Sequence, residues 1–279
     1  MAEQFKAACV IGWPVEHSRS PLIHNHWIGE LGLKAAYRRE AVPPERFADF
    51  IEHLAEHGYV GANVTVPHKE TALRLSEPDE RARAIGAANT LWLDEGVLRA
   101  TNTDVEGFLA NLDAAAPGWD RGLHTALVIG AGGAARAVVF ALIERRIQRI
   151  RVVNRNLERA LALRRQFGES VDPRPFEDAN ALLSDIGLMV NATTLGMAGQ
   201  PPLELALDRL PAAAVVADIV YSALETTLLK EARRRGLRAV DGLGMLLYQA
   251  VGGFVRWFGV RPQVTEDLRA LVEADLIRP

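Results

Sequence analysis

Residues 125–136 read Thr-Ala-Leu-Val-Ile-Gly-Ala-Gly-Gly-Ala-Ala-Arg, and this stretch decides the fold. The apolar run 125–129 is typical of a buried strand. The residues after it match Gly-x-Gly-x-x-Gly/Ala, a pattern that leads from a strand into a helix. There, Gly130 makes a tight turn, Gly132 lets the backbone approach a pyrophosphate, and Ala135 permits close helix–strand packing. The stretch predicts a dinucleotide-binding unit, with an ordinary glycine-rich turn as the alternative.

The alternation of short apolar runs and amphipathic segments extends outward from this stretch over the whole chain. In the second half we expect strands at 125–129, 150–153, 186–191, 215–220 and 237–241, and helices at 133–146, from 157 and at 225–235. In the first half we expect strands at 7–12, 36–42 and 60–66, helices at 21–31, from 44 and from 67, and a hairpin of 89–93 with 97–100. Pro67 is expected to open its helix, because a first-turn residue needs no intrahelical N–H bond.

Such alternation implies crossover connections and mostly parallel sheets. We therefore expect an α/β protein with an N-terminal α/β substrate domain and a Rossmann-type, doubly wound dinucleotide-binding domain. The substrate domain is expected to span 1–105 and 242–279 and the dinucleotide domain 106–241, with a cleft between them. The apolar segment 243–258 follows the second sheet and is expected to pack back on the first domain.

Composition excludes several classes of protein. The net charge of −3 gives no overall basic field for nucleic acid or an anionic membrane. One cysteine, Cys9, excludes an intramolecular disulfide. No apolar run reaches the roughly 20 residues of a membrane span, and the N-terminus lacks a signal-peptide pattern. His53 and His57 have no evident third ligand, so no metal is expected. A soluble, cytoplasmic protein is the expectation.

The end of the strand at 150–153 bears on which dinucleotide is bound. It leads into Asn154-Arg155-Asn156, where NAD-specific proteins commonly carry an acidic residue for the ribose hydroxyls. Arg155 and Arg159 can instead bind a 2′-phosphate, which favours NADP. The alternative is a solvated basic helix, since Arg164 and Arg165 lie nearby.

Four polar clusters occupy predicted strand ends in the first half, at 17–21, 63–69, 86–90 and 101–104. Ser18 and Ser20 offer hydroxyls for a carboxylate, although helix capping is the more common use of a serine such as Ser20 taken alone. Lys69 is unfavourable beside the positive end of a helix dipole, which suggests a local partner or a proton-transfer role; an exposed surface lysine is the alternative. Asp104 suits either an N-cap or a partner of Lys69.

The combined pattern resembles the shikimate dehydrogenase family over nearly the whole chain. The matching stretches are His17-Ser18-Arg19-Ser20-Pro21, Asn63-Val64-Thr65-Val66-Pro67-His68-Lys69, Gly86-Ala87-Ala88-Asn89-Thr90, Asn102-Thr103-Asp104, Gly130–Ala135, Asn154-Arg155, Asn191-Ala192-Thr193-Thr194-Leu195-Gly196-Met197 and 241–250. One departure follows Tyr221, where the family often has two prolines and this chain reads Ser-Ala-Leu-Glu-Thr-Thr. Their loss predicts a looser loop.

The resemblance implies reversible, NADPH-dependent reduction of 3-dehydroshikimate to shikimate, a step toward chorismate and the aromatic amino acids. It implies Lys69 as the acid–base group with Asp104 as its catalytic partner. The other substrate-binding residues it implies are Ser18, Ser20, Asn63, Thr65, Asn89, Tyr221 and Gln249. The cofactor, NADP(H), would lie against Gly130, Ala131, Gly132, Gly133, Ala134, Asn154, Arg155, Arg159, Thr193, Met197, Gly242 and Met245.

Three alternatives stay open. An NAD-dependent quinate/shikimate dehydrogenase is disfavoured by Arg155 and the absent acidic residue. A non-catalytic dinucleotide sensor is expected to lack Lys69 and Asp104, and both are present. A folate-type two-domain dehydrogenase gives no reason for the hydroxyls of 17–21. We expect a small-molecule substrate, no nucleic-acid or membrane partner, and a monomer or homodimer.

Overall fold

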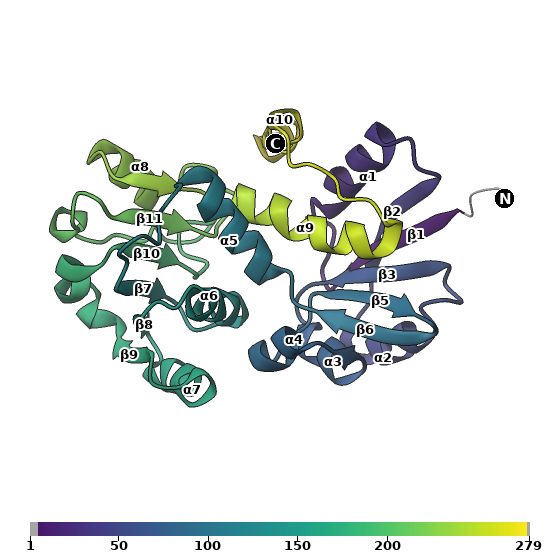
Figure 1. The fold of residues 1–279 in the computed structure, drawn as a ribbon, viewed down its shortest axis with the longest axis horizontal. Coiled ribbons are helices and arrows are strands. Elements are labelled where there is room, and N and C mark those ends of the chain that lie inside the picture. Colours follow the sequence, from purple (N-terminus) through teal and green to yellow (C-terminus); the bar gives the residue numbers. More distant parts are fainter. Residues whose placement is uncertain (1–4, 278–279) are drawn as a thin grey trace. The chain divides into compact units, whose positions relative to one another are not determined.

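The structure, a computed structural model, describes residues 5–277, and these divide into two α/β units (Figure 1). The first unit holds the described residues up to Thr103 and those from Leu247 on. The second runs from Asp104 to Leu246. No helix within residues 5–277 is both long and apolar enough to cross a membrane.

The first unit is built on a mixed sheet in the order β2-β1-β3-β5-β6-β4. Its strands are β1 (Lys6–Gly12), β2 (Ala35–Ala41), β3 (Tyr59–Val64), β4 (Glu77–Pro78), β5 (Thr90–Asp94) and β6 (Val97–Thr101). β1 runs parallel to β2 and β3, whereas β5 runs antiparallel to β3 and β6. The predicted hairpin is present: Glu95 and Gly96, with φ of 49° and 81°, form the tight turn between β5 and β6.

The helices of the first unit are α1 (Ser20–Glu30), α2 (Pro44–Glu52), α3 (Lys69–Arg74), α4 (Glu80–Ile85), α10 (Glu266–Ile277) and the greater part of α9 (Leu243–Phe258). α2 buries Phe47 and Ile51 in the core, the positions at which its apolar periodicity points inward. α9 packs on β3 through Trp257, which lies where a Cβ on Gly61 would be and donates its indole N–H to the Leu91 carbonyl at 2.8 Å.

The second unit has a fully parallel sheet in the order β12-β11-β10-β7-β8-β9. Its strands are β7 (Thr125–Ile129), β8 (Arg149–Asn154), β9 (Val171–Pro175), β10 (Leu188–Asn191), β11 (Val215–Asp218) and β12 (Arg238–Val240). Its helices are α5 (Asp104–Ala115), α6 (Gly133–Glu144), α7 (Leu157–Phe167) and α8 (Thr227–Arg234), with 3₁₀ segments η1 (Phe176–Asp185) and η2 (Leu207–Arg209). The strand order reverses between β7 and β10, which confirms the doubly wound prediction; ligands bind outside such a reversal.

Several elements differ from the expectation. Pro67 does not open a helix: the His68 N–H bonds the Thr65 carbonyl in a turn, and α3 begins only at Lys69. β9 was missed because Pro173 and Pro175 argue against a strand, yet β9 is an edge strand, where missing N–H donors are tolerated. The sequence also missed α4, α10, the two-residue strand β4 and the 3₁₀ segments η1 and η2.

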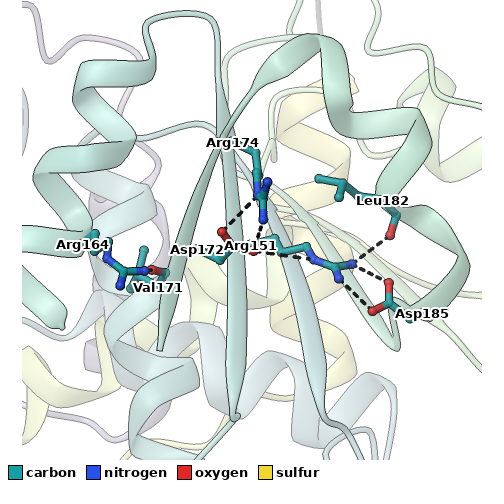
Figure 2. Close-up of polar contacts among 7 residues, drawn as sticks. All are labelled: Arg151, Arg164, Val171, Asp172, Arg174, Leu182 and Asp185. Carbon is teal, nitrogen blue, oxygen red and sulfur yellow. Dashed lines mark hydrogen bonds and ion pairs between the residues drawn. The ribbon is translucent and has the colours of Figure 1, made fainter. Parts of the chain in front are cut away.

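Within the second unit, arginines of β8 and α7 hold η1 and β9 in place (Figure 2). Arg151 of β8 donates to the Asp185 carboxylate at 2.9 Å and to the Leu182 carbonyl at 3.1 Å. Arg164 of α7 donates to the Val171 carbonyl at 3.0 Å. These bonds tie η1 to β8 and β9 to α7.

Candidate functional site

The polar clusters of the first unit meet at one edge of its sheet. β1 and β3 end there, β5 begins there and β6 ends there, since Asn63 pairs with Thr90 and Thr90 pairs with Thr101. Gly12 ends β1 beside Thr65, whose Cγ2 lies 2.4 Å from where a Cβ on Gly12 would be. The glycine therefore makes room for one of the predicted substrate-binding residues.

Asn89 is the centre of a buried hydrogen-bond network at this edge. Its Oδ1 accepts from the Thr103 N–H at 2.8 Å and from the Thr90 hydroxyl at 3.1 Å. Its Nδ2 donates to the Thr103 hydroxyl at 3.1 Å. Asn102 holds the preceding segment by donating to the Ala87 carbonyl at 3.0 Å. Networks of this kind fix side chains in one arrangement, because each buried polar group would be costly to leave unpaired.

Asn63 was predicted to bind substrate, and the structure shows that it is already engaged with protein. Its Oδ1 accepts from the Tyr37 hydroxyl at 2.6 Å, and its Nδ2 donates to the Asn89 carbonyl at 3.3 Å and to the Thr90 hydroxyl at 3.1 Å. Both N–H donors of the amide are used. Asn63 thus supports the Asn89 segment, and its direct contact with substrate stays a prediction.

The serine loop between β1 and α1 is held by two arginines that the sequence did not single out. Arg39 of β2 donates to the Ser18 carbonyl at 3.1 and 2.8 Å. Arg19 pairs with Asp275 of α10 at 2.6 Å. The helix-capping alternative for Ser20 is wrong: Ser20 is the first helical residue, the N-cap is Arg19 and it makes no side-chain cap bond.

Lys69 begins α3 next to the Asn89 segment. Its carbonyl accepts from the Ala88 N–H at 3.0 Å. His68, the residue before it, is buried, stacks on Phe47 with ring centroids 4.2 Å apart, and has its Nε2 2.7 Å from the Val42 carbonyl. Burial lowers the pKa of His68 below its usual value. The start of α3 is thus anchored on both sides of Lys69.

The remaining predicted substrate residues are divided between the units. Gln249 lies on α9 in the first unit. Asp104 is the first residue of α5 and, like Tyr221, belongs to the second unit. The pairing of Lys69 with Asp104 therefore stays a prediction.

The glycine-rich turn of the second unit fits a pyrophosphate. Gly130 has φ of 106°, and a Cβ there would lie 2.8 Å from the Ala192 carbonyl oxygen, so the fold itself requires this glycine. Gly132 and Gly133 differ: a Cβ on either would meet no protein atom within 4 Å, and Gly132 has an ordinary φ of −91°. Close approach of a ligand to the backbone explains their identity where packing does not. Ala131 and Ala134 complete this half-exposed turn.

The end of β8 presents exposed guanidinium groups and no carboxylate. Arg155 and Arg159 are exposed beside the start of α7, while Asn156 caps that helix by accepting from the Glu158 N–H at 3.0 Å. Arg164 and Arg165, the basis of the surface-helix alternative, bond the Val171 carbonyl and the Glu158 carboxylate instead. Asn154 donates to the Asn156 carbonyl at 2.8 Å.

Asp218 holds the loops after β10 and β11 together, and sequence reasoning missed it. Its carboxylate accepts from Asn191 Nδ2 at 3.0 Å, the Val220 N–H at 3.0 Å and the Thr226 hydroxyl at 2.8 Å. Burial raises its pKa, and those three bonds oppose the shift. A carboxylate inside the apolar run 215–220 was the available signal. Because Thr226 is fixed, any loosening from the missing prolines is confined to 222–225.

The other predicted cofactor residues lie around these loops. The Thr193 hydroxyl donates to Asn191 Oδ1 at 2.7 Å, and Met197 is 37% exposed. Gly242 is packed so that a Cβ would lie 2.4 Å from the Ile219 carbonyl oxygen. Met245 follows on α9, half-exposed.

Comparison with known proteins gives consistent results in both units. Residues 10–91 match the shikimate dehydrogenase substrate binding domain, residues 120–199 match shikimate / quinate 5-dehydrogenase, and residues 242–272 match the shikimate 5′-dehydrogenase C-terminal domain. Over 276 residues the chain is 64% identical to a shikimate dehydrogenase (NADP⁺) of Rhodopseudomonas palustris, covering 99% of both chains.

Solved structures agree. The shikimate dehydrogenase of Thermus thermophilus in complex with NADP(H) and shikimate is similar with a TM-score of 0.83 and 35% identity, covering 96% of this chain and 99% of that one. A quinate dehydrogenase of Corynebacterium glutamicum in complex with NAD has a TM-score of 0.87 and 29% identity, covering 97% of this chain and 100% of that one. By sequence, domain content and fold, this chain belongs to the shikimate dehydrogenase family.

Proposed function

We propose that this protein is an oxidoreductase that reversibly reduces 3-dehydroshikimate to shikimate with NADPH. The observation that carries the proposal is the set of polar groups at one edge of the first sheet, where Lys69 adjoins the Asn89 network. The 64% identity to an NADP⁺-dependent shikimate dehydrogenase supports the same activity. In this proposal, residues 1–105 and 242–279 bind substrate and residues 106–241 bind the cofactor.

The substrate is held by complementary hydrogen bonds. The Ser18 and Ser20 hydroxyls, with Tyr221, bind the carboxylate of the ring. Thr65, Asn89 and Gln249 orient the ring hydroxyls. Because Asn89 is locked by Thr90 and Thr103, it is preorganised for this task, and no ordering cost falls on the binding step.

Lys69 carries the proton transfer. As the carbonyl carbon is reduced, negative charge grows on its oxygen, and the Lys69 ammonium donates a proton from Nζ to that oxygen. Asp104 hydrogen-bonds the same reacting group and orients the ammonium. A general acid of this kind contributes roughly 10²–10⁴ in rate.

The second unit has residues that suit the cofactor. Gly132 and Gly133 leave backbone N–H groups open at the start of α6, where the helix dipole favours a pyrophosphate. In this proposal the exposed Arg155 and Arg159 bind the 2′-phosphate, which favours NADP over NAD. When bound, the reduced nicotinamide supplies the hydride.

The test is an absorbance assay of nicotinamide reduction by purified protein with shikimate, comparing NADP with NAD. We expect strong activity with shikimate and NADP. A quinate arm is included because the NAD-bound quinate dehydrogenase shares the fold. Preference for quinate and NAD contradicts the proposal, and inactivity with every pair leaves the sensor interpretation.

Two variants test the assigned chemistry. Lys69→Ala is expected to lower kcat far more than it raises KM, because the interaction is made mainly in the transition state. Asp104→Asn is also expected to lower kcat, and an unchanged rate leaves Asp104 only a structural role at the start of α5. Equal losses in kcat and affinity for Lys69→Ala indicate a binding role only.

The proposal includes a cytoplasmic location, a small-molecule substrate, no nucleic-acid or membrane partner, and a monomeric or homodimeric state. Cell fractionation and light scattering of the purified protein test the location and the oligomeric state.

A further inference from the structure

Tyr37 is a buried tyrosine of β2 whose position is fixed from both sides. The Asn25 side chain of α1 brackets its backbone, accepting from the Tyr37 N–H at 3.0 Å and donating to the Tyr37 carbonyl at 2.9 Å. Its ring stacks on His24 with centroids 4.0 Å apart and planes 10° apart. Only 3% of Tyr37 is exposed, so its hydroxyl is aimed in one direction.

That direction is toward the predicted substrate site. The hydroxyl donates to Asn63 Oδ1 at 2.6 Å, and Ser20 lies near enough to the same hydroxyl to oppose the rise in its pKa. Burial raises the pKa of Tyr37, so the hydroxyl keeps its proton and acts as a donor. Ser20 belongs to the carboxylate side of the site and Asn63 to the ring-hydroxyl side, so one hydroxyl connects the two.

The donated bond also decides how the Asn63 amide is turned. With Oδ1 facing Tyr37, Nδ2 faces the Asn89 carbonyl and the Thr90 hydroxyl, at 3.3 and 3.1 Å. Thr90 and Asn89 then share bonds with Thr103, the residue before Asp104. Without the hydroxyl, Oδ1 would lose a donor inside the protein, and a buried acceptor left unpaired is unstable.

We propose that Tyr37 is a positioning residue for substrate. Through its bond to Asn63 it keeps Asn89 in place, and beside Ser20 it keeps that serine in place for the substrate carboxylate. The inference rests on the proposed function, in which Asn89 and Ser20 contact substrate. Tyr37 touches neither substrate nor cofactor. It acts at the far side of the residues that do, and it belongs to the substrate unit alone.

Tyr37→Phe tests this inference, because it removes the hydroxyl and keeps the stacked ring. We expect KM for shikimate to rise about tenfold, the effect of one buried hydrogen bond, with kcat changed less than threefold. KM for NADP should stay the same, since the cofactor residues lie in the other unit. Unchanged shikimate KM, or equal changes in both KM values, overturns the proposal.

Tyr59→Phe is the matched control. Tyr59 is also a buried tyrosine of the same sheet, 4% exposed, and its hydroxyl donates to Glu40, which is not among the predicted site residues. The Tyr59→Phe variant should lose about as much thermal stability as Tyr37→Phe and keep the wild-type KM for shikimate. If Tyr59→Phe raises the shikimate KM as much as Tyr37→Phe does, the effect is general loosening and the proposal fails.

Shikimate analogues that each lack one ring hydroxyl give a second readout. The penalty of Tyr37→Phe should shrink for the analogue missing the hydroxyl that Asn89 holds, because the displaced group then has nothing to bind. An equal penalty for every analogue contradicts the inference. Wild-type activity separates the two proposals: an inactive wild type refutes the proposed function, whereas an active wild type with an unaffected Tyr37→Phe refutes only the role of Tyr37.

Discussion

His24 should make the first unit sensitive to acid. The side chain is fully buried on α1, packed against Tyr37, Trp27 and Phe254, and neither ring nitrogen has a hydrogen-bond partner within the described residues. Burial lowers the pKa of His24 from 6.5 to about 3. The folded protein therefore holds His24 neutral in a range where the unfolded chain protonates it.

The sign follows from proton uptake. Below pH 6.5 the unfolded chain binds a proton at His24 that the folded protein refuses until about pH 3, so stability is full above 6.5 and falls as the pH drops. Each pH unit in this window costs about 1.4 kcal/mol. Between pH 7.5 and 4.5, His24 should therefore remove about 3 kcal/mol of unfolding free energy.

The assay is urea unfolding at pH 7.5 and 4.5, followed by tryptophan fluorescence. Four of the five tryptophans, Trp119 being the exception, belong to the unit that contains His24. His24→Leu has similar volume and no titrating group, so it should lose about 3 kcal/mol less than wild type between the two pH values. Carboxylates titrate in both proteins and cancel in this comparison. Equal acid losses in the two proteins would refute the reasoning.

Three further predictions concern single contacts. Gly130→Ala should destabilise the second unit by about 1–3 kcal/mol, because Gly130 has a φ of 106° and lies against the Ala192 carbonyl. Gly132→Ala should keep its stability and bind NADP about tenfold more weakly. Calorimetry measures the stability of each variant, and titration measures its affinity for NADP. Thr226→Ala removes the α8 cap and a bond to Asp218, and should cost about 2 kcal/mol in chemical denaturation. Trp257→Phe leaves the Leu91 carbonyl without its indole donor and should lower the unfolding free energy by about 1–3 kcal/mol. A Tm measurement checks this, and an unchanged Tm would contradict a stabilising role for the contact.

The local sequence pattern was sufficient to predict an element where consecutive residues determine its conformation. The run 125–136 predicted β7, the turn and α6, because strand, glycines and helix follow one another in the chain. The residues 94–96 predicted the hairpin for the same reason. Pro67 shows the limit: its local preference suits a first helical turn, but the Thr65–His68 turn takes precedence and α3 begins later.

The candidate site was predicted as residue types rather than as an arrangement. Ser18, Lys69 and Asn89 were identified because the ends of strands deliver polar groups to a binding edge of the sheet and because the family pattern includes them. Tyr37, Arg39 and Asp218 were missed, since each acts on a partner distant in sequence. Tyr37 lies in a strand whose other residues are alanines and charged residues, and it is the one fully buried position of that strand, so no apolar alternation marks it.

The sequence by itself therefore determined the two α/β units, the dinucleotide turn and the residue types at the site, because periodicity, glycine spacing and strand ends are local properties. Only the tertiary structure decided which of those side chains are held and by what. The hydroxyl of Tyr37 reaches Asn63 across the sheet, and Asp218 reaches Thr226 across a loop. Such bonds form between buried groups that the fold brings together, and burial gives them their strength.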